Sequence, residues 1–308
     1  MAILQNEATH IDTSFLPPFP ERPSDCLVRR VLPTLHHRTV GPFILVDQRG
    51  PADLDVGRGF DLAPHPHIGI ETLTYLVDGE IIHRDNLGNV QTVGPGEVNW
   101  MAAGSGIVHS EHTPPAMRTT GSNLFGMHAW IALSLRHEAA PPDFAHYAAS
   151  EVPRTRDNGV EVTLIAGASD GLTSPVRTFS DLVCAEILLT SGSRYQVRPG
   201  YHERAIYVVA GEVEIVGKHG TFSEAELLML DPGVEVVLRA PAFHAARLLL
   251  IGGEPFAEPR HIYWNFVSSS AERIEQAEAD WRERRFPGVP GEEVSAPLSA
   301  DHIEGTGD

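Results

Sequence analysis

The sequence contains little cysteine. Its 308 residues include two cysteines, Cys26 and Cys184. A single, widely spaced pair does not make the disulfide framework of a small secreted domain, and it lacks the thiolates of a typical structural zinc site. We therefore expect two reduced, buried thiols in a cytoplasmic protein.

Basic residues and long apolar runs are also scarce. The chain has 23 Lys and Arg against 41 Asp and Glu, a formal net charge of -18 at pH 7, whereas binding to a nucleic-acid backbone needs clustered positive charge. No apolar run approaches the length of a membrane-spanning helix, and the first residues lack the basic and apolar segments of a signal peptide. The sequence thus predicts no direct binding to nucleic acid and no membrane segment.

Glycine and proline, in contrast, are plentiful, at 28 and 24 residues. Short apolar stretches alternate with polar residues between turn signals, which is typical of an all-β barrel or sandwich. We predict an N-terminal barrel over 1–137, a linker over 138–158, a C-terminal barrel over 159–266, and a helix with a tail over 267–308. Residues 1–25 and the tail from residue 289 are expected to be irregular.

One helix is predicted, over residues 271–285. Ser269 and Glu272 have the spacing of a capping box at its start. Its apolar stripe contains Ile274, Ala277 and Trp281.

An internal repeat links the two halves of the chain. The segment YLVDGEI over 75–81 resembles YVVAGEV over 207–213, at an offset of 132 residues. Carrying this offset upstream pairs the following residues: His65 with Val197, His67 with Pro199, and Glu71 with Glu203. The second copy therefore lacks the histidines of the first, and we expect it to serve as scaffold, pocket wall or partner surface.

Two pairs of metal-capable side chains stand out in the first copy. His65 and His67 form one pair, His109 and Glu111 the other, each spaced i, i+2. In a β-strand this spacing places both side chains on one face. Facing strands would bring together three imidazoles and one carboxylate, a donor set suited to Fe, Ni, Cu, Mn or Zn. An octahedral ion with these four ligands keeps two positions open for water, a bidentate substrate, or substrate with dioxygen.

Glu71 leaves an alternative open. If 65–77 is one strand, Glu71 shares a face with His65 and His67. It is then the carboxylate ligand, a hydrogen-bond partner of a ligand, a general base, or a structural glutamate.

Three other histidines are given structural roles. We expect a surface ion pair within His83-Arg84-Asp85, with a position at the mouth of a pocket as the alternative, and we expect His128 to be a hydrogen-bonded core residue. His112 lies on the opposite face of its strand from Glu111 and is not expected to be a ligand.

Longer motifs surround these residues. The runs in question are HPHIGIETLTYLVDGEIIHRDNLGN, GPGEVNWMAAGSGIVHSE, the upstream GPFILVDQRGPADL, and the downstream YWNFVSSSAERIEQAEADW and RFPGVPG. Together they resemble the pirin family of the cupin superfamily over roughly residues 28–292.

The resemblance implies a bicupin with two tandem jelly-roll-like cupin barrels and metal in the N-terminal one. The implied ligands are His65, His67, His109 and Glu111, around one divalent ion. Fe(II) is the first expectation, with Ni, Cu, Mn, Co or Zn as alternatives. The late glycine after Glu71 and the long segment before His109 depart from the general cupin pattern but are pirin-like, and they favour Glu111 over Glu71 as the ligand.

The resemblance also implies two classes of function. Some bacterial pirins resemble flavonol 2,3-dioxygenases, so our first hypothesis is a metal-dependent dioxygenase that cleaves a flavonol or similar phenolic with O₂. In it, Glu111 or Glu71 accepts the substrate hydroxyl proton. The alternatives are an iron-dependent, redox-sensing regulator that acts through a protein partner, and a metal-binding bicupin with another small substrate. We expect a monomer.

Overall fold

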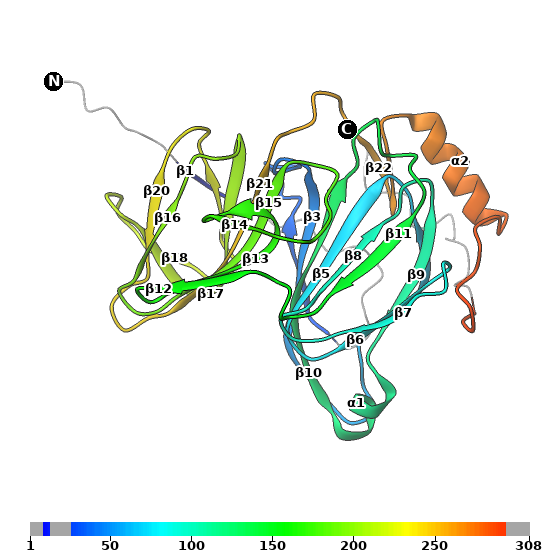
Figure 1. Cartoon of the computed structure of the whole chain (residues 1–308), viewed down its shortest axis with the longest axis horizontal. Helices are drawn as coiled ribbons and strands as arrows, with labels where there is room; N and C mark the ends of the chain where they lie inside the picture. Colours follow the sequence, from blue (N-terminus) through cyan, green and yellow to red (C-terminus); the bar gives the residue numbers. More distant parts are fainter. Residues whose placement is uncertain (1–8, 13–25, 294–308) are drawn as a thin grey trace. The chain divides into compact units, whose positions relative to one another are not determined.

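The computed structural model describes residues 9–12 and 26–293, and these form mainly β-strands (Figure 1). The predicted all-β fold is confirmed. Most of the stretch 1–25 and the tail after residue 293 lie outside the described residues. None of the helices in the described part of the chain has the length and apolar character needed to cross a membrane.

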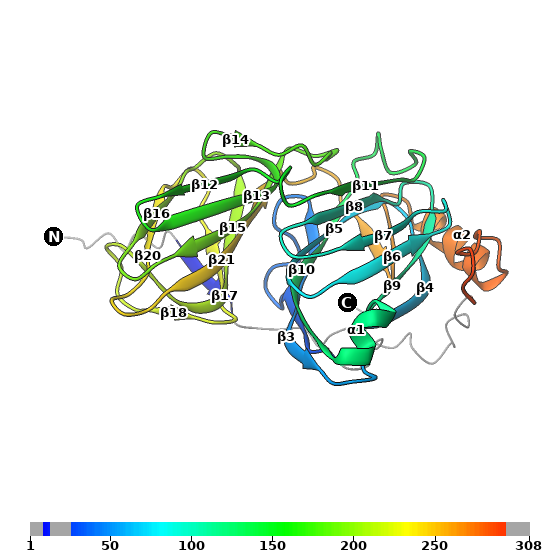
Figure 2. The ribbon, with the colours of Figure 1, turned by 60° about the horizontal axis from the view of Figure 1, so that its bottom comes forward.

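The N-terminal barrel consists of two sheets and a short helix. Its elements are β2 (Val28–Leu32), β3 (Phe43–Leu54), β4 (Asp61–His67), β5 (Ile70–Asp78), β6 (Ile81–Asp85), β7 (Val90–Val93), β8 (Val98–Ala102), β9 (Ile107–His112), α1 (Pro115–Thr120), β10 (Ser122–Ala132) and β11 (Asp143–Tyr147). One sheet has the order β11-β8-β5-β10-β3-β2 and the other the order β4-β9-β6-β7. Figure 2 shows the four strands of the smaller sheet running next to one another.

The chain changes sheet between β4 and β5. The sequence predicts one strand through 65–77, but the structure ends β4 at His67 and begins β5, in the other sheet, at Ile70. Gly69 lies at this change, with a φ of +69°. Only glycine adopts such a backbone without strain, and a Cβ there would lie 1.9 Å from the carbonyl oxygen of Val267. The single-strand prediction is therefore wrong. Residues before and after Gly69 cannot be assigned to a common strand face by their spacing.

The second barrel has an apolar interior. Its strands are β1 (Thr9–Asp12), β12 (Arg154–Asp157), β13 (Val160–Ser169), β14 (Leu172–Thr173), β15 (Leu182–Leu189), β16 (Arg194–Val197), β17 (Glu203–Ile215), β18 (Phe222–Ser223), β19 (Leu227–Leu230), β20 (Val236–Arg239) and β21 (Ala246–Gly253). Buried Leu164, Ile206 and Leu248 belong to one hydrophobic cluster there, as does Val197, the counterpart of His65. The interior of this barrel is thus packed with hydrocarbon where the first barrel has histidines.

The repeat predicted at offset 132 has a structural counterpart. Gly79 follows β5 and Gly211 lies in β17, and their φ angles are +82° and +79°. At each glycine a Cβ would lie 2.0 Å from a backbone carbonyl oxygen, that of Asn123 in one case and Ala245 in the other. The same backbone constraint therefore recurs at matching positions of the two barrels.

The compact units differ from the contiguous domains predicted. Among the described residues, one unit combines 9–12, 30–46 and 147–256, and the other combines 26–29, 47–146 and 257–293. The stretch 138–158, predicted as a linker, contains β11 and β12, which pair with β8 and β13 respectively. The Ala- and Pro-rich sequence does not predict these strands, because neither of them alternates clearly between apolar and polar residues.

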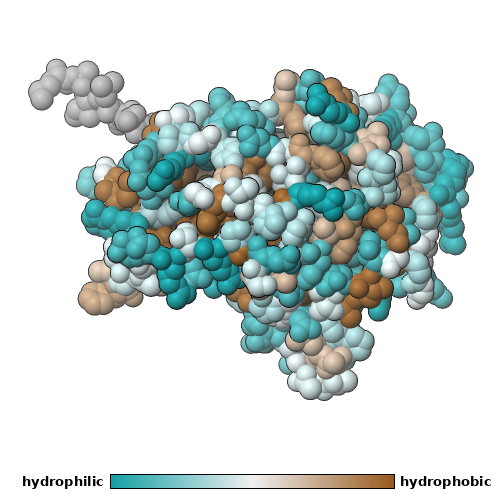
Figure 3. All heavy atoms as spheres, in the orientation of Figure 1, coloured by the Kyte–Doolittle hydropathy of each residue, from teal (hydrophilic) through white to brown (hydrophobic). Residues whose placement is uncertain are grey.

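The C-terminal segment belongs to the unit that contains the N-terminal barrel. It consists of β22 (His261–Tyr263), β23 (Phe266–Ser268) and α2 (Ala271–Arg282). The N-cap of α2 is Ser270, one residue after the predicted Ser269, and its side chain accepts a hydrogen bond from the backbone of Arg273. The outward surface of this helix is hydrophilic, as the right edge of Figure 3 shows.

The buried stripe of α2 supports the strands β4 and β9. Ile274, Ala277 and Trp281 are buried as predicted, in a cluster with Ile68 and Val108. Ile68 follows His67 and Val108 precedes His109, so the helix backs the strands that carry the candidate ligands.

The change of sheet at Gly69 makes a testable prediction. We expect Gly69→Ala to lower the free energy of unfolding by more than about 1 kcal/mol, because it adds a backbone clash to left-handed strain. Gly88→Ala is the matched control: its φ is +91° and no atom lies within 4 Å of a Cβ there. Urea unfolding of both variants measures the difference, and equal losses would contradict a role for the contact with Val267.

Candidate metal centre

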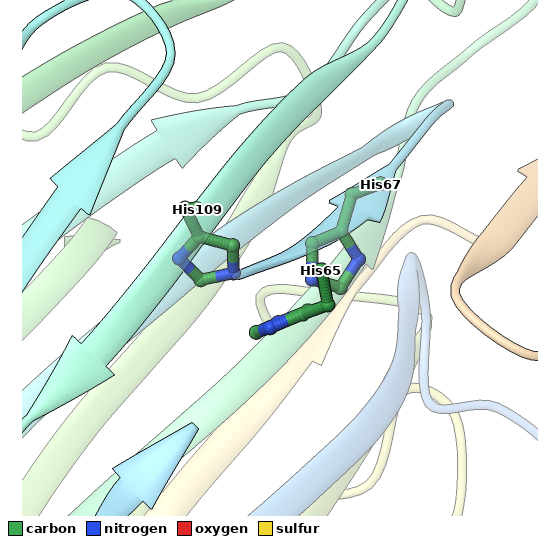
Figure 4. Close-up of side chains that lie close together, drawn as sticks. All are labelled: His65, His67 and His109. Atoms are coloured by element: carbon green, nitrogen blue, oxygen red, sulfur yellow. The ribbon is translucent and has the colours of Figure 1, made fainter. Parts of the chain in front are cut away.

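Two neighbouring strands carry the three predicted histidine ligands. β4 pairs with β9 in antiparallel register, with His65 opposite His109. Directly opposite residues share a face of the sheet, and His67 follows His65 by two residues on that face. Figure 4 shows the three imidazoles gathered between these strands.

The three rings are close enough to share one ion. One ligand atom from each of His65, His67 and His109 lies within 4.8 Å of the others, the one such group among the described residues. The ring centroids are 4.4 to 5.1 Å apart. His67 and His109 are buried, whereas His65 is partly exposed. The cluster is therefore reached from solvent on the side of His65.

The free nitrogens of the cluster fit metal binding. His67 Nδ1 and His109 Nε2 are buried without a hydrogen-bond partner, which costs about 1–3 kcal/mol per group unless a ligand compensates. Nδ1 of His65 lies 2.8 Å from the carbonyl oxygen of Ala63, so it donates its hydrogen and leaves the lone pair on Nε2.

Burial keeps two of these imidazoles neutral. It lowers the pKa of His67 and of His109 well below the usual value, and the neighbouring histidine rings lower both further. A metal ligand must have a free lone pair, so neutral histidines at physiological pH suit a metal centre.

Glu111 lies on the same strand but faces a cation. Its Oε2 is 2.8 Å from Nη2 of Arg49, both side chains being buried, and Thr74 Oγ1 donates to its Oε1 at 3.4 Å. Burial by itself raises the pKa of Glu111, but the charge and hydrogen bond of Arg49 outweigh it and lower the pKa to about 2. The carboxylate is thus anionic, and the histidine group in the structure does not include it.

A chain of hydrogen bonds leads to Glu111 from the other sheet. Trp130 Nε1 donates to Nε2 of His128 at 3.0 Å, which leaves the hydrogen of a neutral His128 on Nδ1. That nitrogen lies 3.0 Å from Thr74 Oγ1, whose own hydrogen points to Glu111. The core role predicted for His128 agrees with these bonds, and its connection to Glu111 through Thr74 is new.

The ion pair predicted at the surface is in fact buried beside the cluster. His83 and Asp85 are 4% and 0% exposed, and β6 pairs with β9 so that Asp85 lies opposite His109. The surface prediction is wrong because His83 and Asp85, which share a strand face at i, i+2 spacing, lie on the buried face of β6. His112, as expected, is outside the cluster and pairs with Asp61 and Glu292.

Glu71 is not brought together with the histidines. It is fully buried, and its Oε1 accepts a hydrogen bond of 2.7 Å from Trp100 Nε1. Thr74 is three positions further along β5, so the two side chains lie on opposite faces of the strand. Thr74 faces Glu111, and Glu71 therefore faces away from it.

Comparison with known proteins assigns the chain to a family. The chain matches the Pirin model over residues 26–131 and the Pirin C-terminal cupin domain over residues 184–287. The protein belongs to the pirin family, and the predicted pair of cupin barrels is confirmed.

Individual relatives agree with this assignment. The chain is 44% identical to a pirin-like protein of Caulobacter vibrioides, over 84% of this chain and 89% of the relative. It is 36% identical to a Pseudomonas aeruginosa protein with the provisional name quercetin 2,3-dioxygenase, over 88% and 85%. A crystal structure of quercetin 2,3-dioxygenase from Acinetobacter baumannii superposes with a TM-score of 0.84 at 30% identity, covering 96% of this chain and 95% of that one.

The Arg49–Glu111 pair gives a pH-dependent prediction. Arg49→Met leaves a buried carboxylate without its cation, so we expect the free energy of unfolding at pH 7 to fall by about 3–5 kcal/mol. In the wild type the pKa of Glu111 is lowered from 4.5 to about 2, so its contribution is complete above pH 4.5 and is lost as the pH falls toward 2. In the variant, burial raises this pKa instead, and the difference between the two proteins shrinks on acidification.

Urea unfolding of chelator-treated protein between pH 7 and pH 3 measures this difference. The variant that carries both Arg49→Met and Glu111→Gln is the control, and it should recover most of the stability at pH 7. A difference that stays constant with pH would contradict the account.

Proposed function

We propose that this protein binds one divalent metal ion, preferentially Fe(II), in its N-terminal barrel and is a quercetinase-like dioxygenase of the pirin type. Its substrate is then a flavonol or a similar phenolic, cleaved with O₂. The observation that carries the proposal is the group of three histidines with ligand atoms within 4.8 Å, two of which have a buried nitrogen without a hydrogen-bond partner. The names of the relatives support the reaction class.

The ligands in this proposal are His65, His67, His109 and Glu111. These three imidazoles and one carboxylate would hold the ion and would leave room for exogenous ligands on it. When bound, the metal supplies Lewis acidity and one-electron redox chemistry. Glu111 contributes the single anionic ligand, and Arg49, at 2.8 Å, keeps it ionised.

Glu111 is better suited to orient a substrate hydroxyl than to remove its proton completely. A carboxylate with a pKa of about 2 is a weak base, but it is a strong hydrogen-bond acceptor. The bond from Thr74 holds its Oε1, and His128 in turn fixes the hydroxyl of Thr74. We give this role to Glu111 and none in the chemistry to Glu71, whose carboxylate is held by Trp100 on the other face of β5.

Aromatic side chains border the cluster. The Trp130 ring lies edge-on to His67, with centroids 5.0 Å apart, and the Phe144 ring stacks on His83 at 4.3 Å. Such surroundings favour a flat phenolic ligand. The cytoplasmic location, the monomeric state and a regulatory protein partner stay predictions from the sequence.

Turnover of quercetin tests the reaction. Protein loaded with Fe(II) under anaerobic conditions should bleach the flavonol absorbance when quercetin and O₂ are added, because substrate and O₂ can then meet at the open positions. The same protein with His65→Ala and His67→Ala should not. Absence of turnover with Fe, Ni, Co, Mn and Cu, each bound at one ion per chain, would refute the dioxygenase proposal.

The carboxylate ligand is tested separately. We expect Glu111→Gln to weaken metal binding more than Glu71→Gln, since only Glu111 shares a strand face with His109. Competition with a chromophoric chelator gives the two dissociation constants. If Glu71→Gln has the larger effect, the ligand is Glu71 and the assignment made here is wrong.

A further inference from the structure

A second buried pair lies directly behind one of the proposed ligands. His83 Nδ1 is 3.4 Å from Nδ1 of His109, at the long end of the hydrogen-bonding range. On the other side of the ring, His83 Nε2 is 3.0 Å from Oδ2 of Asp85. Asp85, His83 and His109 thus form a line in which each member contacts the next.

The direction of the hydrogen bonds along this line is determined at the Asp85 end. Oδ1 of Asp85 accepts from the backbone N–H groups of Leu87 and Asn89, and the side-chain amide of Asn89 donates to both oxygens. A carboxylate so surrounded by donors is an acceptor toward His83 as well. His83 therefore carries a hydrogen on Nε2, and in the neutral imidazole its Nδ1 then has a lone pair.

This lone pair determines the tautomer of His109. The hydrogen bond between the two Nδ1 atoms needs one donor, and that donor is His109. With its hydrogen on Nδ1, His109 has its free lone pair on Nε2, the buried atom that lacks any hydrogen-bond partner. The pair behind His109 thus selects the tautomer in which Nε2 can bind a metal.

The pair is also rigidly held. The Phe144 ring stacks on His83 with an interplanar angle of 12° and a centroid distance of 4.3 Å. The turn after Asp85 is tied to β9, because Asn86 Oδ1 accepts from the backbone N–H of Val108, the residue before His109. A ring that is stacked on one face and has a partner at each nitrogen can hold its neighbour in one orientation.

We propose that His83 and Asp85 are positioning residues for the metal centre: they fix His109 in the tautomer and orientation that present Nε2 to the ion, and they strengthen its electron donation. The inference rests on the proposed metal centre. Partners of this kind typically change metal affinity 10–100-fold when they are removed.

Two substitutions of His83 separate hydrogen bonding from packing. His83→Phe keeps an aromatic ring against Phe144 but removes the acceptor, whereas His83→Asn loses the ring but can place an oxygen near the former Nδ1. We expect His83→Phe to weaken Co(II) binding about 10–100-fold and to shift the d–d absorption bands of the bound ion. His83→Asn should retain most of the affinity and wild-type bands. A role in packing alone predicts the reverse order.

Asp85→Asn and a matched control complete the set. Asp85→Asn should also weaken Co(II) binding, but by a smaller factor. The asparagine side chain keeps an oxygen acceptor and loses only the negative charge. His112→Phe is the control, since His112 also pairs with an aspartate, Asp61, but does not contact the cluster; it should bind Co(II) as the wild type does. All affinities are measured by chelator competition on proteins whose thermal unfolding is recorded in parallel.

The outcomes distinguish the two levels of the proposal. Failure of the wild type to bind one Co(II) per chain refutes the metal centre itself. If the wild type binds but His83→Phe has the same affinity and spectrum, or His83→Asn is as weak as His83→Phe, the positioning role is refuted while the metal centre stands. Should His83→Phe not fold, wild-type affinity in Asp85→Asn refutes the role.

Discussion

The candidate centre depends on the register between β4 and β9. The pairing of His65 with His109 places both on the face that also carries His67, and a slip by one residue would turn one strand's side chains to the opposite face. Several features outside the strand pairing hold this register. Gly69 turns the chain out of the sheet at one end, and α2 packs its buried stripe against Ile68 and Val108, which are the direct neighbours of His67 and His109. A helix far along the sequence thus stabilises the geometry of the proposed ligands.

The two barrels show what a polar interior requires. In the second barrel a continuous apolar cluster fills the interior and is stabilised by burial and packing. In the first, buried charges and imidazoles need specific partners, because an unpaired buried charge is strongly destabilising. Arg49 pairs with Glu111, Asp85 with His83, and Trp130 with His128. The histidine nitrogens left without a hydrogen-bond partner are in the same barrel. The free-energy cost of burying them therefore arises where a bound ligand would offset it.

Local patterns in the sequence predict most of the strands, the repeat and the histidine cluster, because an i, i+2 pair and a turn depend on few residues. Predictions failed where tertiary structure intervenes. The prediction that Glu71 shares a strand face with His67 fails because the chain changes sheet at Gly69, which lies between them. The partnership of Arg49 with Glu111 could not be predicted, since it joins strands 62 positions apart in the sequence by packing across the barrel. The i, i+2 spacing of His83 and Asp85 indicates a shared strand face. The charged Arg84 between them, however, is typical of an exposed strand, and the sequence therefore favours a surface position.

The charges around the cluster bear on which metals the site can select. Three imidazoles supply most of the donors, and the negative charge of Glu111 is balanced by Arg49 at 2.8 Å. Hard ions such as Ca²⁺ and Mg²⁺ bind mainly to oxygen and gain their affinity from uncompensated carboxylates. A site with nitrogen donors and little net negative charge gives them small advantage, whereas imidazole suits Fe, Ni, Cu and Zn. With this donor set the orientation of each imidazole bears directly on affinity, and we propose that His83 and Asp85 fix that orientation for His109.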